Sequence, residues 1–156
     1  MVKLGVRPPR ELVKSTGFLL KRVGWAIKDS TMARFEEAGE SVYHYAVLAV
    51  LDESARETQA TIADALGYDR SYLVGLLDEL EERKLIERRR DPTDRRRHLV
   101  KLTADGRKTL KRLRAISKEV EEEFLAPLSD AQRETLHGLL LRLAVHHDPR
   151  YGNGSA

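Results

Sequence analysis

The chain contains no cysteine, and this absence removes several kinds of chemistry. Without thiols the protein can form no disulfide bond, no zinc–thiolate centre and no cysteine nucleophile or thiol-based redox sensor. Its stability and function must therefore rest on packing, hydrogen bonds and charge.

Long apolar runs and aromatic residues are also scarce. No window approaches the roughly 18 uninterrupted apolar residues of a membrane-spanning helix, and residues 1–10 lack the apolar block of a signal peptide. We therefore expect a cytoplasmic protein with no membrane partner. Only three Phe and one Trp occur, whereas 34% of the 156 residues are charged, and this composition favours a helical, surface-rich domain over a β-sandwich.

Apolar residues recur at three- and four-residue steps along most of the chain, which predicts helices. Thr58, Asp69 and Ser129 occupy positions where an N-cap would begin a helix, and Gly67 stands where a left-handed residue would end one. The expected helices cover residues 12–35, 42–51, 58–67, 70–83, 103–124 and 129–143. In the second of them the expected buried stripe is Tyr43, Ala46, Val47, Val50 and Leu51.

Positive charge is concentrated in residues 83–101, where nine cationic side chains face three acidic ones although the whole chain carries only +3. Pro92 with its flanking acids predicts a tight turn, and the apolar pairs Leu85-Ile86 and Leu99-Val100 predict a short strand on each side. A cationic hairpin tip that follows a helix has the electrostatic character of a nucleic-acid contact.

The expected elements follow the order of a winged helix-turn-helix: a short helix over residues 58–67, a tight turn, a second helix over 70–83 and then the hairpin. The first helix and the last two have more apolar surface than so short a chain can cover, which indicates a second copy of the chain as partner. The predicted fold is mainly α with a small β-hairpin wing. It comprises a DNA-binding lobe at residues 42–102 and a helical dimerisation module at residues 10–37 with 103–147, between flexible ends at 1–9 and 148–156.

The helix that begins near Arg70 carries the candidate base-reading residues. With Leu73, Leu76, Leu77 and Leu80 turned toward the core, its other face would present a set of residues to a major groove. A serine can hydrogen-bond to bases, a valine can touch a thymine methyl group, and an arginine at the helix start can reach guanine or a phosphate. The candidate residues are Arg70, Ser71, Tyr72, Val74 and Gly75.

The wing supplies the second set of candidates. Asp94 is expected to orient one guanidinium in a fork, so that an arginine can enter a narrow minor groove. Because neighbours on a strand point to opposite faces, Arg95, Arg96 and Arg97 cannot all reach one target. Arg88 and Arg90, with Arg89 between them, are expected to contact phosphates or to pair with acids.

Plainer alternatives remain for each element. Any amphipathic helix has a polar outer face, and a run of charge on a hairpin can simply be solvated. A winged helix can also bind another protein without binding specific DNA. Steep salt dependence of duplex binding would separate these possibilities.

Residues 66–96, with their continuation over 99–106, resemble the MarR family of multiple-antibiotic-resistance-type regulators. The most specific part is the wing motif Asp-Pro-x-Asp-Arg-Arg at 91–96, followed by Leu-Thr-x-x-Gly at 102–106. The resemblance extends over residues 10–147 and implies a homodimer that binds a pseudo-palindromic operator in double-stranded DNA and usually represses nearby genes. It matches Asp94, Arg95 and Arg96 to positions that contact the minor groove.

Two positions depart from the pattern of the family. Gly75 stands where many relatives carry a larger polar or basic residue, so one usual contact with DNA is missing. Lys84 stands where relatives usually carry glycine, and a left-handed lysine there is strained by about 1 kcal/mol.

Many members of the family bind a small aromatic acid between the dimer helices and the DNA-binding lobe. Trp25, Tyr43, His44 and Tyr45 lie on helices that would line such a pocket, and His44 could bind a carboxylate. The alternative is that these four are core side chains with satisfied polar groups.

Metal and enzyme chemistry have little support in the sequence. His146 and His147 are neighbours on a helix and point about 100° apart, so a shared metal ion would need further ligands. No catalytic triad, paired carboxylates, phosphate-binding loop or dinucleotide motif is present. We expect a regulator without metal or cofactor, and not an enzyme.

Overall fold

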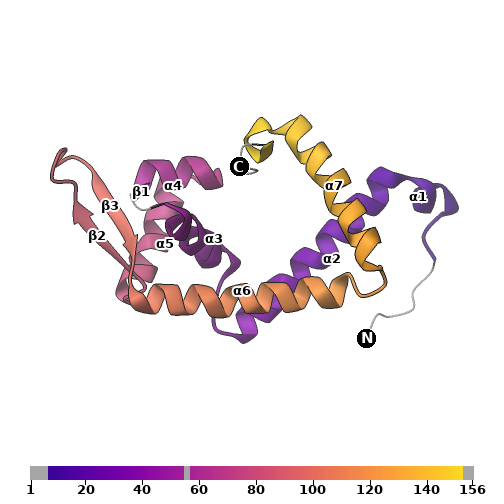
Figure 1. The fold of residues 1–156 in the computed structure, drawn as a ribbon, viewed down its shortest axis with the longest axis horizontal. Helices are drawn as coiled ribbons and strands as arrows, with labels where there is room; N and C mark the ends of the chain where they lie inside the picture. The colour runs from indigo at the N-terminus through magenta and orange to yellow at the C-terminus, as the bar shows by residue number, and fades with distance from the viewer. Residues whose placement is uncertain (1–6, 55–56, 153–156) are drawn as a thin grey trace. The chain divides into compact units, whose positions relative to one another are not determined.

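The computed structural model describes residues 7–54 and 57–152 (Figure 1). The chain divides into two compact units, the first ending at Val120 and the second starting at Glu121. Helices dominate and one small sheet is present, which confirms the predicted fold class. In chain order the elements are α1 (Arg10–Lys14), α2 (Thr16–Glu37), α3 (Val42–Glu53), β1 (Glu57–Thr58), α4 (Gln59–Leu66), α5 (Arg70–Glu82), β2 (Ile86–Arg90), β3 (His98–Leu102), α6 (Ala104–Phe124), α7 (Asp130–His147) and the 3-10 helix η1 (Pro149–Gly152).

The helix expected over residues 12–35 is interrupted at Ser15. This residue has extended backbone angles (φ −81°, ψ 115°), and its Oγ accepts the N–H of Phe18 at 3.2 Å. Serine is a strong N-cap because its hydroxyl satisfies a donor of the first turn, so α2 starts afresh after it. The apolar spacing continues across the break, and periodicity alone therefore did not reveal it.

Three helices of the first unit end in the same kind of turn. A residue with positive φ is followed by one whose N–H bonds to a carbonyl five residues back. The positive-φ residues are Gly39 (73°), Gly67 (66°) and Lys84 (59°). The predictions for Gly67 and Lys84 are thereby confirmed, and the lysine side chain makes its turn strained. The closing bonds run from Glu40 to Phe35, from Tyr68 to Ala63 and from Leu85 to Leu80.

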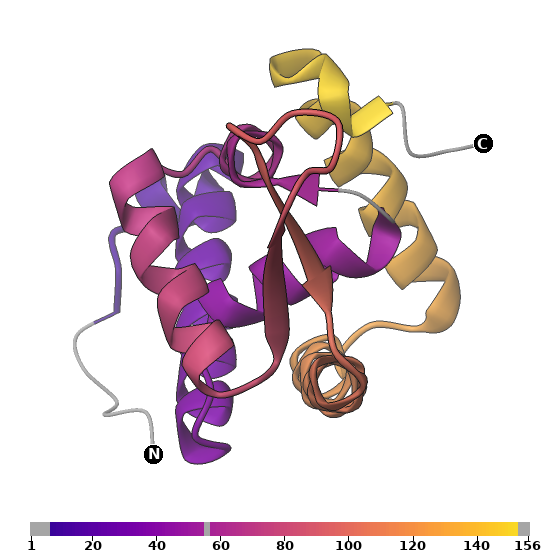
Figure 2. The same cartoon turned by 90° about the vertical axis from the view of Figure 1, so that its left-hand side faces the viewer.

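The predicted hairpin is confirmed and belongs to a three-stranded antiparallel sheet of order β1-β3-β2. Strands β2 and β3 pair from Ile86 opposite Leu102 at the base to Arg90 opposite His98 near the tip. Strand β1 joins the outer side of β3, and two residues are too few for the sequence to show a strand's alternation. Figure 2 shows the hairpin in front of the helices of the first unit.

The core of the first unit lies between the sheet and helices α3 to α6, and the leucine stripe of α5 is buried as predicted. For α3 the prediction is right at Val47 and Leu51, but it is wrong at Tyr43, which is 37% exposed, and it misses the buried His44 and Leu48. The true stripe starts at His44 and follows the same helical spacing. The largest fully buried side chains are Phe35, Val47, Leu48, Ile62, Leu73, Leu77, Leu80, Ile86, Val100, Leu110 and Leu113.

Helix α6 starts in backbone contact with the segment that leaves α5. Thr103 donates its hydroxyl to the carbonyl of Lys84 at 2.7 Å, and its Oγ1 accepts the N–H of Gly106 at 3.0 Å. A Cβ atom on Gly106 would lie 2.0 Å from the carbonyl oxygen of Leu85. Only glycine therefore fits at this position.

The second unit consists of the end of α6, then α7 and η1. Helix α7 begins, as predicted, at Ser129, and a reciprocal pair of hydrogen bonds with Gln132 forms a capping box. Within the part of the chain that the structure describes, no residue of α7 is buried and no helix is long and apolar enough to cross a membrane. Regular structure continues to Gly152, inside the predicted flexible end, whereas residues 1–6 and 153–156 of those ends lie outside the described residues.

Candidate nucleic-acid interface

Asp69 caps the start of α5, as predicted. Its Oδ1 accepts the backbone N–H groups of Ser71 at 2.9 Å and of Tyr72 at 3.3 Å, and the Ser71 hydroxyl also donates to it. These bonds, with that of the hydroxyl largest, hold the pKa of Asp69 below its usual value. The carboxylate charge is thus directed at the helix start, and Ser71 in this arrangement can only accept a hydrogen bond from DNA.

The outer face of α5 is open. All five residues predicted to face the major groove, Arg70, Ser71, Tyr72, Val74 and Gly75, are exposed. A Cβ atom on Gly75 would meet nothing within 4 Å, so the glycine leaves a gap in the face and no packing requires it. A larger side chain would fit there.

The tip of the wing is held by two aspartates that accept hydrogen bonds from the turn. Asp91 accepts the N–H and the hydroxyl of Thr93 at 2.8 and 2.7 Å, and these bonds lower the pKa of Asp91. Asp94 accepts the N–H of Arg96 at 3.0 Å and lies 3.5 Å from Nε of Arg97. The prediction of a fork is therefore wrong: Asp94 orders the turn through the backbone and meets one guanidinium at a single long contact.

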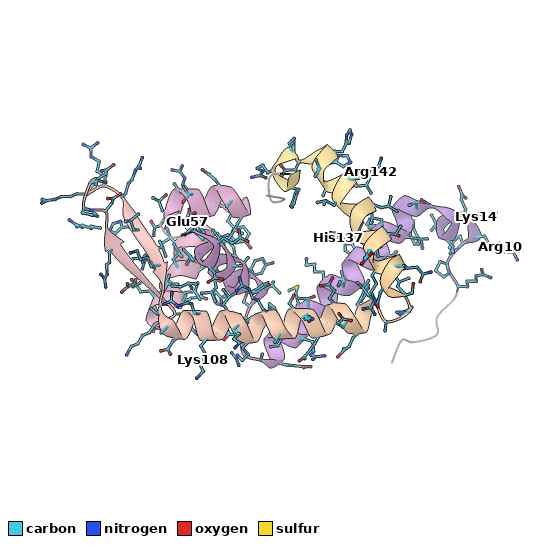
Figure 3. All side chains as sticks on the ribbon, in the orientation of Figure 1. Arg10, Lys14, Glu57, Lys108, His137 and Arg142 are labelled. Atoms are coloured by element: carbon cyan, nitrogen blue, oxygen red, sulfur yellow. The ribbon has the colours of Figure 1, made fainter. Side chains whose placement is uncertain are left out.

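Two arginines at the tip remain available. Within residues 57–152, no hydrogen bond or ion pair engages the exposed guanidinium of Arg95 or Arg96. Figure 3 shows side chains that extend outward from the tip of the β2–β3 hairpin. No acid of the described residues pairs with these two guanidinium groups, so their charge faces solvent.

A hollow of about 380 Å³ lies between the wing and α5, the recognition helix of the predicted helix-turn-helix. Arg70 and Val74 line it from α5, and Arg96, Arg97 and His98 line it from the wing side. Its remaining residues, Thr58 to Thr61 and Leu73, come from the start of α4 and from the core edge of α5. The sequence did not identify the α4 residues or His98 as part of the site. The predicted N-cap at Thr58 did, however, place the start of a helix at this end of α4.

Arg88 takes one of the two roles predicted for it, because it pairs with acids of α5. Its Nε and Nη2 donate to Oε2 of Glu81 at 2.9 and 2.5 Å, and Nη2 also lies 2.6 Å from Oδ1 of Asp78. The hydrogen bond with Glu81 is the largest cause of a raised pKa at Arg88 and of a lowered one at Glu81. Arg88 thus links β2 to α5 by pairing with acids and is not available to a phosphate. Arg90, by contrast, stays exposed.

Tyr72 packs against two tyrosines that the sequence did not connect with it. The ring centroids of Tyr43, Tyr68 and Tyr72 lie 5.7 to 6.2 Å apart in edge-to-face contacts. Burial, followed by the charges of the other two phenols, raises the pKa of Tyr68. The cluster supports the start of α5 from the side, and no periodicity links residues on three different elements.

The four residues of the predicted effector pocket have four separate sets of neighbours. Trp25 stacks under Nζ of Lys21 at 4.5 Å, and Tyr45 packs edge-on against Phe35. Nε2 of His44 lies 2.8 Å from Oε2 of Glu79, while Tyr43 belongs to the tyrosine cluster. Because Tyr43, His44 and Tyr45 are consecutive on a helix, they point in different directions. His44 already has a carboxylate partner, and none of these contacts joins the four residues to one another around a hollow. The effector pocket stays a prediction.

Metal-binding residues do not gather in the described part of the chain. No group of three or more His, Cys, Asp or Glu side chains there is placed to hold an ion. The rings of His146 and His147 lie 5.1 Å apart and face each other edge-on.

A helix-turn-helix with an open outer face, a hairpin beside it and free arginines at the hairpin tip define a winged helix-turn-helix protein. Comparison with known proteins agrees. The model of the MarR family matches residues 41–97. The transcriptional regulatory protein for the hcr operon of Thauera aromatica is 33% identical over 135 residues, which is 81% of each chain.

Solved structures give the same result. CouR of Rhodococcus jostii RHA1, bound to p-coumaroyl-CoA, is 32% identical with a TM-score of 0.71 over 87% of this chain and 96% of that one. The repressor CouR bound to a 23-mer DNA duplex is 30% identical with a TM-score of 0.79, over 90% and 99% of the two chains. The chain belongs to the MarR family of DNA-binding transcriptional regulators, and an enzyme is thereby excluded as predicted.

Proposed function

We propose that the protein is a homodimeric repressor that binds a pseudo-palindromic site in double-stranded DNA. The observation that carries this proposal is the hollow in which Arg70 and Val74 of α5 meet Arg96 and Arg97 of the wing. Helix and wing offer cations to one space, so a duplex can be held in a major groove and the next minor groove together.

The proposed roles follow from which side chains are exposed on α5 and at the wing. Arg95 and Arg96 enter the minor groove, while Arg90 and Arg97 contact phosphates beside it. Arg70 reaches a guanine edge or a phosphate, and Val74 meets a thymine methyl group. Asp94 acts indirectly, since its hydrogen bond to the N–H of Arg96 keeps the tip in shape.

Exposed leucines support the dimer. On α2 the side chains of Leu19, Leu20 and Val23 are 44 to 50% exposed, and on α7 those of Leu139 and Leu143 are 50 to 52% exposed. So much apolar surface on two helices is what a helical dimer covers. We therefore assign dimerisation to residues 10–37 with 103–147 and DNA binding to residues 42–102.

The test is salt-dependent binding to a duplex selected from a random DNA pool. Several phosphate contacts per dimer predict an affinity loss on the order of 10³ between about 50 and 200 mM salt. Arg142→Ala on α7 serves as a control that removes one exposed cation far along the sequence from helix and wing. Weak, salt-insensitive binding would instead favour the alternative, a winged helix that binds protein.

Release by a small aromatic acid or its thioester completes the proposal. Support comes from CouR, whose structure contains p-coumaroyl-CoA. Adding p-coumarate or p-coumaroyl-CoA to the protein–duplex complex is expected to weaken binding at least tenfold. If neither compound changes the affinity, this ligand class is wrong for the protein, while DNA binding stands by itself.

A further inference from the structure

Glu40 is a carboxylate enclosed by the first unit. It follows Gly39 in the turn that ends α2, where its own N–H bonds to the carbonyl of Phe35 at 2.9 Å. Its side chain is only 2% exposed. A charge removed from water to this extent is stable only when it is paired and hydrogen-bonded.

Two arginines provide that pairing. Arg83, the residue after α5, donates from Nη2 to Oε1 at 2.8 Å and from Nη1 to Oε2 at 3.1 Å. This fork is the geometry in which a guanidinium and a carboxylate fix each other's orientation. The same Oε1 accepts a hydrogen bond from Nη2 of Arg112 on α6 at 2.8 Å.

The three residues join three elements at one point. Glu40 lies in the turn between α2 and α3, Arg83 directly follows α5, and Arg112 lies on α6. Figure 1 shows the turn from α2 to α3 running beside α6. A second ion pair, Arg34 with Glu119 at 3.0 Å, links α2 to α6 without involving α5. The Glu40 pairs therefore connect the end of α5 both to the turn after α2 and to α6.

The position of this joint amplifies small movements. Helix α5 has 13 residues, so its first residue, Arg70, lies about 18 Å from its last one. A tilt of about 5° at Arg83 would move the start of α5 by roughly 1.5 Å. The distance range of a good hydrogen bond is only about 0.5 Å wide, so such a tilt would disturb every base contact.

We propose that Glu40 is a positioning residue that sets the angle of the recognition helix through Arg83 and Arg112 and thereby the half-site spacing that the dimer accepts. This inference rests on the proposed function. Glu40 touches no DNA in this account, and its effect passes through the two arginines.

The experiment compares Glu40→Gln with Asp148→Asn on duplexes whose half-sites are moved apart or together one base pair at a time. Each substitution removes the negative charge of a carboxylate that pairs with arginine, but only the first removes a contact with the end of α5, because Asp148 pairs with Arg150 beyond α7. We expect Glu40→Gln to lower affinity for the best-spaced duplex at least tenfold and to flatten the dependence on spacing. Asp148→Asn should retain both, and thermal unfolding would check that each variant folds.

The sign of the effect separates positioning from simple electrostatics. Loss of a negative charge by itself attracts DNA more strongly, so a charge effect would tighten binding where loss of positioning weakens it. Unchanged or tighter binding by folded Glu40→Gln, with the spacing preference intact, overturns the inference while the proposed function stands. Failure of the unmodified protein to bind any duplex overturns both.

A second variant covers the case in which Glu40→Gln does not fold. Arg83→Gln breaks the same joint at a side chain that is 38% exposed. If Arg83 only positions α5, affinity falls and spacing preference flattens while the slope of affinity against salt stays the same. A slope reduced by about two units, roughly one for each protomer of the dimer, with spacing preference unchanged, identifies Arg83 as a phosphate contact and overturns its role as a joint.

Discussion

In the middle of strand β2 Arg88 is paired twice, with Glu81 and Asp78, and its side chain is 20% exposed. At the tip of the same hairpin, among the residues described, Arg95 and Arg96 have exposed guanidinium groups without a partner. The residue type is the same, and only the surroundings differ. In this wing a paired arginine stabilises the scaffold, whereas an unpaired one remains available to a ligand.

The base should tolerate much less change than the tip. Gly106→Ala places a Cβ atom against the backbone of Leu85, which cannot yield as a flexible side chain would. We expect a loss of about 3 kcal/mol or more in the free energy of unfolding, measured by urea denaturation. Gly75→Ala on the open face of α5 is the matched control and should gain roughly 0.5–1 kcal/mol, because alanine favours helix over glycine.

The two arginines at the tip should matter for DNA binding and little for stability. Arg96→Ala should lower operator affinity about tenfold or more, with a smaller loss for Arg95→Ala, because each removes a free cation that can enter the minor groove. The midpoint of thermal unfolding and the oligomeric state should stay unchanged. A variant that unfolds earlier or fails to dimerise would show that the arginine belongs to the scaffold.

Arg88→Ala should show the reverse pattern. Removing it leaves Glu81 and Asp78 close together without a cation, and we expect about 1–2 kcal/mol less stability, discounted for partial exposure. Because the folded pKa of Glu81 is lowered, the stabilisation is present above the ordinary pKa of a glutamate and is lost as pH falls through the lowered value. The stability gap between wild type and variant should therefore close from about pH 4.5 downward.

Titration of urea denaturation midpoints against pH would measure this gap. A gap that is constant to low pH would indicate that Arg88 acts through packing of its aliphatic part and not through its charge.

The smallest expected effect concerns the turn between α5 and β2. Lys84 has a φ of 59°, so Lys84→Gly should relieve strain and raise stability by roughly 1 kcal/mol. The hydrogen bond from Thr103 goes to the backbone carbonyl and is retained. Lys84→Ala keeps a Cβ atom in the same conformation and should gain nothing, which separates strain from loss of the lysine charge.

Much of the fold could be predicted because its signals are local. Asp69 and Ser129 begin helices because their side chains accept N–H groups two or three positions away. Gly67 ends a helix because glycine readily adopts a positive φ. The wing followed from a proline turn between two apolar pairs. Ser15 and β1 were missed because a break that preserves apolar spacing and a two-residue strand have almost no periodicity.

The candidate site could be predicted only in part. The exposed residues on α5 followed from helical geometry and those at the wing tip from the charged turn around Pro92, and both signals depend on neighbours in sequence. The wing-tip arginines lie in the turn between β2 and β3 and not on a strand, so strand alternation does not govern them. The partners of Arg88, His44 and Glu40 lie 7, 35 and 43 residues away, and no pattern of spacing connects such pairs. Tyr43 was expected to be buried, but it packs against Tyr68 and Tyr72. His44 is buried instead and contacts Glu79.

By itself, then, the sequence determined which segments are helices, where the hairpin turns and where positive charge is concentrated, since each depends on residues a few positions apart. The tertiary structure alone decided which arginines are already paired and which remain for DNA. That choice depends on burial and on acids brought close from distant parts of the chain, because the free energy of a charge is set by its surroundings in space.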